Sequence, residues 1–136
     1  MDKIFNWTSI IIGAIGGCVI TLLGGWDKLI MALLLLMCFD YITGLIKAIF
    51  NKKLSSQIGF KGILKKVLIL VIVSVSVIAE NYLGVPAVRE MVIMFFAVNE
   101  ALSVLENAGN MGLPLPKKLK QALIQIRDEK GVNKDE

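Results

Sequence analysis

Long apolar segments separated by short polar ones make up most of the chain. Runs of about twenty apolar residues match the length that an α-helix needs to cross a hydrocarbon core of ~30 Å. The predicted membrane-spanning helices lie at about residues 7–25, 29–50, 67–83 and 87–107. The apolar part of the fourth is short, because Arg89 and Glu90 delay its start to near Met91. Three spans with a peripheral helix are therefore the alternative to four.

Two basic segments interrupt or follow the apolar pattern. Residues 51–66 contain no acidic side chain and predict a cytoplasmic loop. Its basic residues are Lys52, Lys53, Lys61, Lys65 and Lys66. Pro114 and Pro116 end the fourth helical pattern, and apolar positions then recur at helical spacing. We expect a transmembrane domain of residues 1–112 and a cytoplasmic tail of residues 113–136. The tail contains a basic amphipathic helix, which lies on an anionic membrane surface or bundles with its own copies.

Composition excludes several classes of protein. The mean hydropathy is +0.73, and 56% of the residues are hydrophobic, more than a small soluble domain can bury. Four spans leave no room for a separate catalytic domain. The chain has no histidine, and no cluster has the spacing of metal ligands. The sequence therefore predicts an all-α membrane protein that is not an enzyme, with no metal, no cofactor and no nucleic-acid partner.

The distribution of basic residues predicts the orientation in the membrane. Twelve of the 15 Lys and Arg residues lie before the first span, within residues 51–66, or after the fourth span. Lys28 and Arg89 fall near the other side. Because basic residues accumulate on the cytoplasmic side of short loops, both termini and residues 51–66 are expected in the cytoplasm. The agreement of three separate segments favours an even number of spans.

Polar side chains occur at membrane depth. They are Asp40, Lys47, Glu80, Asn81, Asn99, Glu100, Glu106 and Asn107. A charged Asp at the centre of a helix costs ~2.5–3.5 kcal/mol to insert, and either protonation or pairing lowers that cost. Three interpretations remain open. These residues hold helices together, line an aqueous path in an oligomer, or couple ion movement to transport.

Small residues at four-residue spacing predict where helices approach closely in lipid. The three pairs are Gly13 with Gly17, Gly44 with Ala48, and Ala97 with Ala101. The second and third pairs lie beside polar residues. Helix–helix contacts in membranes use this combination, so we expect packing faces at these positions.

Two blocks of sequence resemble a known family. Asp40-Tyr41-x-Thr43-Gly44 is followed by Ser55-Ser56 and Gly59-x-x-Gly62-x-x-Lys65-Lys66, and the second block is NEALSVLENAGNMGLPLPKKL, residues 99–119. Both resemble the toxin-secretion and phage-lysis holins of Gram-positive bacteria and their phages, over about residues 25–127. One departure is Glu80-Asn81, where such proteins often carry an Asp.

The resemblance implies a homo-oligomer in the bacterial cytoplasmic membrane that permeabilises it, so that an endolysin or a large toxin leaves the cytoplasm. Its partners would be the lipid bilayer, copies of the same chain, and that endolysin or toxin. We expect Asp40, Lys47, Asn99 and Glu100 to form a face that lines water in the assembled state. A membrane adaptor or antiholin that regulates a holin is one alternative, and a small ion-coupled transporter is another.

Overall fold

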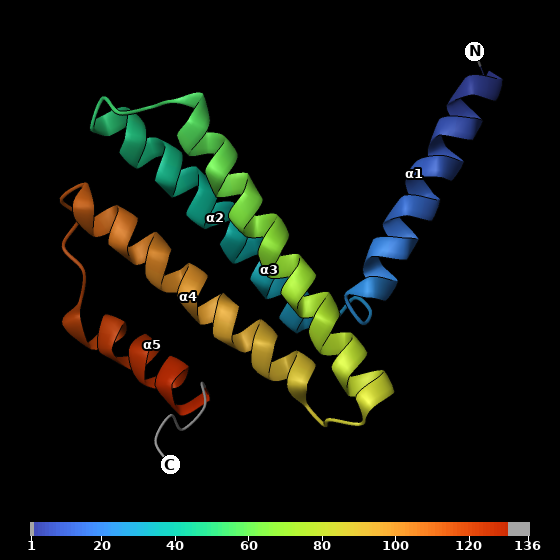
Figure 1. Cartoon of the computed structure of the whole chain (residues 1–136). Coiled ribbons are helices and arrows are strands. Elements are labelled where there is room, and N and C mark those ends of the chain that lie inside the picture. The colour runs from blue at the N-terminus through green and yellow to red at the C-terminus, as the bar shows by residue number, and fades with distance from the viewer. Residues whose placement is uncertain (1, 131–136) are drawn as a thin grey trace.

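The computed structural model describes residues 2–130, and every regular element in this range is an α-helix (Figure 1). The elements are α1 (Asp2–Leu22), α2 (Lys28–Phe50), α3 (Ser56–Leu83), α4 (Val88–Asn110) and α5 (Lys117–Lys130). The all-α prediction is confirmed for this part of the chain. Residues 131–136 of the predicted tail lie outside the described residues.

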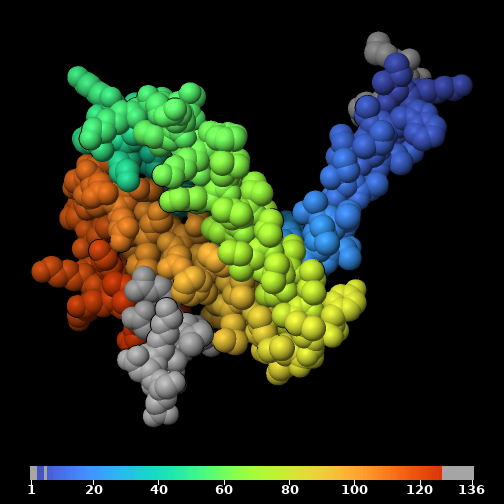
Figure 2. Space-filling model, viewed as in Figure 1, coloured from blue at the N-terminus to red at the C-terminus, as the bar shows by residue number. Residues whose placement is uncertain are grey.

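A three-helix bundle forms the centre of the molecule. α4 packs along α2 and also against α3, whereas α2 and α3 touch each other over only a short distance. α5 folds back along α4, and α1 projects away from the bundle (Figures 1 and 2). The buried core consists of Leu23, Ile30, Leu33, Met37, Ile69, Val73 and Ile93. α4 is therefore the helix that holds the other two together.

Two helices, α2 and α3, are long and apolar enough to cross a bilayer. The apolar part of α1, Asn6–Leu22, is shorter. Large apolar side chains such as Leu35, Phe39 and Ile78 are exposed. In water such a surface would be a liability, whereas lipid accommodates it. α1 and α4 remain predicted spans, and so does the total of four.

The basic segment differs from its predicted form. Residues 51–66 were expected to be a loop, but α3 begins at Ser56, so the loop is limited to residues 51–55. The Ser55 side chain caps the helix by accepting a hydrogen bond from the backbone N–H of Ile58 at 3.2 Å. Lys61, Lys65 and Lys66 consequently occupy the first half of α3. The loop prediction is wrong because a basic, weakly apolar segment still forms a helix once its first turn is capped.

Arg89 joins the two turns at the opposite end of the bundle. Its Nε donates to the carbonyl of Leu23 at 2.7 Å, and its Nη2 donates to that of Gly25 at 3.3 Å. Its Nη1 lies 2.6 Å from Asp27 Oδ2. The backbone N–H of Arg89 also donates to Glu80 Oε2 at 3.1 Å. One buried guanidinium thus fastens the α1–α2 turn to the start of α4.

Gly24 makes this arrangement possible. Its φ of +78° favours glycine, and a Cβ at this position would lie 2.5 Å from Nε of Arg89. Asp27 adds a second function, because its Oδ1 accepts from the backbone N–H of Ile30 at 2.9 Å and so caps α2. The turn is therefore fixed at both its backbone and its side chains.

Candidate functional site

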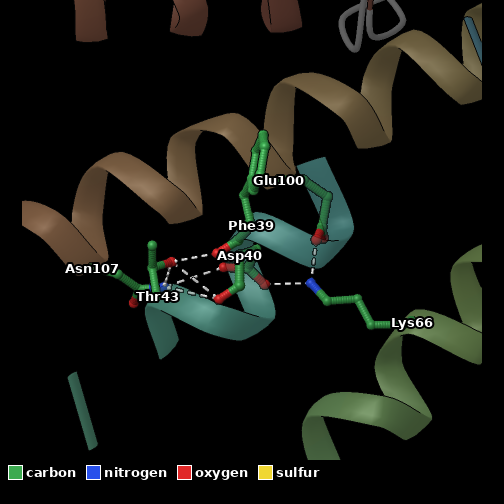
Figure 3. Close-up of polar contacts among 6 residues, drawn as sticks. All are labelled: Phe39, Asp40, Thr43, Lys66, Glu100 and Asn107. Carbon is green, nitrogen blue, oxygen red and sulfur yellow. Dashed lines mark hydrogen bonds and ion pairs between the residues drawn. The ribbon is translucent and has the colours of Figure 1, made fainter. Parts of the chain in front are cut away.

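Three helices each contribute one ionised side chain to a single cluster. Lys66 of α3 donates hydrogen bonds to Oδ2 of Asp40 on α2 and to Oε2 of Glu100 on α4 (Figure 3). All three side chains are largely buried, with exposed fractions of 16%, 17% and 10% for Lys66, Asp40 and Glu100. Two carboxylates thus share one ammonium group, which offsets much of the cost of burying them.

Asn107 and Thr43 complete the cluster on the side away from Lys66 (Figure 3). Nδ2 of Asn107 donates to Oδ1 of Asp40 at 3.2 Å and to Oγ1 of Thr43 at 3.1 Å. The Thr43 hydroxyl donates back to the carbonyl of Phe39 at 2.8 Å. The Asp40 carboxylate is therefore bonded through both oxygens, to α3 on one side and to α4 on the other.

The cluster lies near the middle of the helices that form it. Asp40 is ten residues from the end of α2, and Lys66 is ten residues from the start of α3. At about 1.5 Å per residue, the cluster is ~15 Å from the ends of these helices at the 51–55 loop. Because α3 runs antiparallel to both α2 and α4, residues so distant in sequence reach the same level (Figure 1).

Two glycines of α3 allow the close approach of α2 beside the cluster. A Cβ on Gly59 would lie 3.3 Å from the Tyr41 hydroxyl, and one on Gly62 would lie 3.2 Å from its ring. These distances are tighter than ordinary van der Waals contact. The Gly-x-x-Gly spacing therefore presents a flat surface on which Tyr41 rests, one residue after Asp40.

An open cleft of about 730 Å³ borders the cluster. Its walls come from α2, the following loop and α3, and its floor comes from α4. Asp40, Lys66 and Glu100 line it together with Asn99 and Ser103. The short contact between α2 and α3 explains the cleft, because these helices separate where both continue to pack on α4.

The predicted polar residues fall into three groups. Asp40, Glu100 and Asn107 meet in the cluster, as described, while Lys47 and Asn99 line the cleft. Glu80 and Asn81 lie at the opposite end of α3, where Glu80 binds Arg89 and Asn81 is exposed. Glu106 faces α5, with its Oε1 3.9 Å from Nζ of Lys120. The eight residues therefore do not form one continuous face.

Sequence reasoning missed Lys66 as the partner of the carboxylates and assigned it to a loop. It also left Thr43 without a role in this cluster. The signal that would have identified Lys66 is the cap at Ser55, which extends the helix of residues 67–83 backward. Once α3 is extended, Lys66 is an ammonium group placed directly before the long apolar run.

The predicted packing positions behave differently from one another. A Cβ on Gly44 would lie 3.8 Å from the Asn107 amide nitrogen, and Ala48 is buried. Ala97 packs on the core and Ala101 is half-buried. Gly13 and Gly17 have open space around them, because a Cβ on either would meet nothing within 4 Å. The small residues of α2 and α4 therefore lie in contacts within this chain, whereas those of α1 do not.

The fold and the cluster define a small helical membrane protein that encloses ionised groups between its helices. Over residues 17–128 its sequence matches the bacteriophage holin family. The chain belongs to this family. The resemblance identified from Asp40–Gly44 and from the 99–119 block is thereby confirmed at the level of the family.

Relatives of similar length occur in several Gram-positive bacteria. An uncharacterized 14.9 kDa protein of the nagH 3′ region in Clostridium perfringens is 39% identical over 132 residues, covering 96% of this chain and all of the relative. An uncharacterized Listeria monocytogenes protein is 38% identical, covering 100% and 95%. An uncharacterized protein of Halalkalibacterium halodurans is 36% identical, covering 95% and 98%. No solved structure is significantly similar to the chain.

Proposed function

We propose that the protein is a holin that oligomerises in the bacterial cytoplasmic membrane and permeabilises it, so that an endolysin or a large toxin leaves the cytoplasm. Membership of the bacteriophage holin family supports a holin-like membrane function. The observation that carries the finer proposal is the position of Lys66 between Asp40 and Glu100. With Lys66 in this position, a single chain would conceal a polar face until copies assemble.

In the separate chain, Lys66 neutralises charge that lipid would otherwise meet. Asp40 and Glu100 are held toward the bundle interior, and Asn107 satisfies the second oxygen of Asp40. This arrangement is the closed form in our proposal. It lets chains accumulate in the membrane without conducting ions, because ionised groups facing each other carry little cost compared with groups facing hydrocarbon.

Assembly would convert the same groups into the wall of an aqueous path. α2 and α3 already diverge around the cleft, and α3 is attached to α4 less extensively than α2 is. Outward movement of α3 would separate Lys66 from the two carboxylates. Water would then solvate all three groups, and Asn99 and Lys47 along the cleft would join the wetted surface.

The direction of the helices is consistent with both termini in the cytoplasm. The start of α1, the 51–55 loop and the end of α4 lie toward one end of the molecule, and the other two turns lie toward the opposite end (Figure 1). The start of α1, the 51–55 loop and the start of α5 carry lysines at the first of these ends, and α5 then runs back along α4 (Figure 1). A four-span topology with that end inside satisfies the positive-inside rule.

Expression in a bacterium together with a cytoplasmic endolysin tests the proposal. We expect abrupt lysis and release of a cytoplasmic marker protein only when both are present. A matched control carries Asp40→Asn and Glu100→Gln, which keep shape but remove the charges that Lys66 binds. Because this variant leaves Lys66 without a counter-charge, its level in the membrane is matched to that of the parent chain, and we then expect altered lysis timing.

Two results would identify the alternatives. Delay of lysis caused by a separate holin, without lysis by this chain, would indicate an antiholin or adaptor. Coupled uptake of a small solute into liposomes, with no leakage of large dextrans, would indicate a transporter. Either result would overturn the pore proposal.

A further inference from the structure

The cleft between α2 and α3 contains more positive charge than the cluster requires. Lys47, Lys53 and Lys65 line it in addition to Lys66. The structure gives none of these three described side chains an ion-pair partner, whereas Lys66 has two. Asn51, which can also donate hydrogen bonds, lies among them at the loop end of the cleft.

Apolar side chains form the deeper part of the same cleft. Leu68, Ile69 and Ile72 of α3 line it, and Phe96 of α4 contributes to its floor, whereas Leu45 and Ile58 lie nearer the loop. Ile72 is six residues beyond Lys66, hence about 9 Å further from the 51–55 loop. The cleft therefore changes from basic near the loop to apolar in the direction of the bilayer centre.

This gradient matches one class of molecule. We propose that the cleft binds one anionic phospholipid, with its phosphate between Lys47 and Lys53 and an acyl chain along Leu68 and Ile72. Lysine side chains are long enough to reach the interface from within a span, and basic pockets between membrane helices bind acidic headgroups. A free anion would use the lysines but leave the apolar wall without an occupant.

The position of the lipid has a mechanical consequence. An acyl chain in the cleft would keep α2 and α3 apart beside the two contacts that join them, Tyr41 on Gly59 and Gly62 and the Lys66–Asp40 ion pair. The phosphate would lie about 10 Å from Asp40 along α2, since Lys47 is seven residues closer to the loop. Because one chain supplies every residue that lines the cleft, lipid binding does not depend on the proposed function.

Native mass spectrometry of the full chain in detergent tests the site, with phosphatidylglycerol and phosphatidylcholine as probes. We expect one retained phosphatidylglycerol per chain and much weaker retention of phosphatidylcholine. Lys47→Gln with Lys53→Gln should weaken phosphatidylglycerol binding roughly tenfold or more, since each basic residue near a headgroup contributes on the order of 1 kcal/mol. Lys117→Gln with Lys118→Gln removes equal charge from α5 and should leave binding unchanged.

A second variant, Leu68→Asn, tests the apolar wall. It should weaken the binding of phosphatidylglycerol but not the binding of inorganic phosphate. Three results would overturn the proposal. Equal losses of phosphatidylglycerol binding in the two double-lysine variants would indicate a diffuse basic surface. Glycerol phosphate that binds and displaces the lipid equally well would indicate a free-anion site. Disulfide cross-links between copies from a cysteine at Ile72, undiminished by added lipid, would indicate that a second chain fills the cleft.

Discussion

Asp40 on α2 and Glu100 on α4 share a single cation, the ammonium group of Lys66 on α3. This relationship joins three helices through one side chain. Formally the cluster holds two negative charges and one positive charge. The stability of the bundle should therefore fall when one of these charges is removed alone, and should fall less when all three are removed together.

Replacement of Lys66 by Met should strongly destabilise the bundle. Two carboxylates would remain enclosed without a cation, and removal of one partner of a buried pair costs about 3–5 kcal/mol. Unfolding by SDS in micelles, followed by far-ultraviolet circular dichroism, measures the change. Lys61→Met is the matched control, because Lys61 is exposed on the same helix.

The triple variant Lys66→Met, Asp40→Asn, Glu100→Gln should recover most of that loss, because no unpaired charge remains. If Lys66→Met and Lys61→Met unfold at the same SDS concentration, the ion pairs contribute nothing to the fold. The lysis assay separates stability from function. The triple variant should fold, but lysis should begin at a different time than with the parent chain.

Asn107→Ala should cost about 1–3 kcal/mol, because Oδ1 of Asp40 loses its donor inside the bundle. The control is Asn110→Ala at the exposed end of the same helix. Asn107→Asp should be worse than Asn107→Ala, since it places a third carboxylate beside Asp40. Equal unfolding of the Ala and Asp variants would argue against a direct contact in solution.

Gly24→Ala should destabilise the chain by roughly 2–4 kcal/mol. Its φ of +78° disfavours a side chain, and the new methyl group would collide with Nε of Arg89 and with a methyl of Val77 at 2.9 Å. Gly84→Ala measures the cost of the backbone conformation alone, because Gly84 has a φ of +69° and open space around it. That control should cost only about 1–2 kcal/mol. Similar losses at both positions would mean that Arg89 does not occupy the turn.

Acid should loosen the α1–α2 turn. The hydrogen bond from Arg89, and then that from the Ile30 backbone, lowers the pKa of Asp27 below its usual 3.8. A group with a lowered folded-state pKa stabilises the fold above its ordinary pKa and loses that contribution as the pH falls through the lowered value. The effect therefore belongs to the range below about pH 4.

Fluorescence of the neighbouring Trp26, in a chain carrying Trp7→Phe, reports this change locally. We expect an acid transition in the parent chain that is absent from Asp27→Asn. The same transition in both proteins would assign it to other carboxyl groups.

The apolar pattern was sufficient to predict the central helices. The predicted span at residues 29–50 differs from α2 by one residue, because a continuous apolar run and a polar boundary coincide there. α3 was harder, since its first half is basic and its start depends on one serine cap. Hydropathy measures the affinity of a segment for lipid, and a basic segment that forms a helix leaves no hydropathy signal.

The candidate site was predicted only in part. Asp40 and Glu100 were identified because a carboxylate in an apolar run is costly wherever it lies. Their partner was not, because Lys66 is 26 residues from one and 34 from the other. Such a pairing depends on how three helices pack on each other. The hydrophobic pattern of each single helix carries no information about that packing.

Arg89 holds the turn between α1 and α2 through its hydrogen bonds to Leu23 and Gly25, and α1 extends away from the bundle with open space around Gly13, Gly16 and Gly17 (Figure 2). The 23–27 turn is therefore fixed to α4, whereas the ion pairs of Lys66 lie on α2, α3 and α4 and involve no residue of α1. A change in the tilt or the neighbours of α1 would leave these ion pairs intact, so in the proposed holin the recruitment of another chain and the opening of the cluster would be mechanically separable.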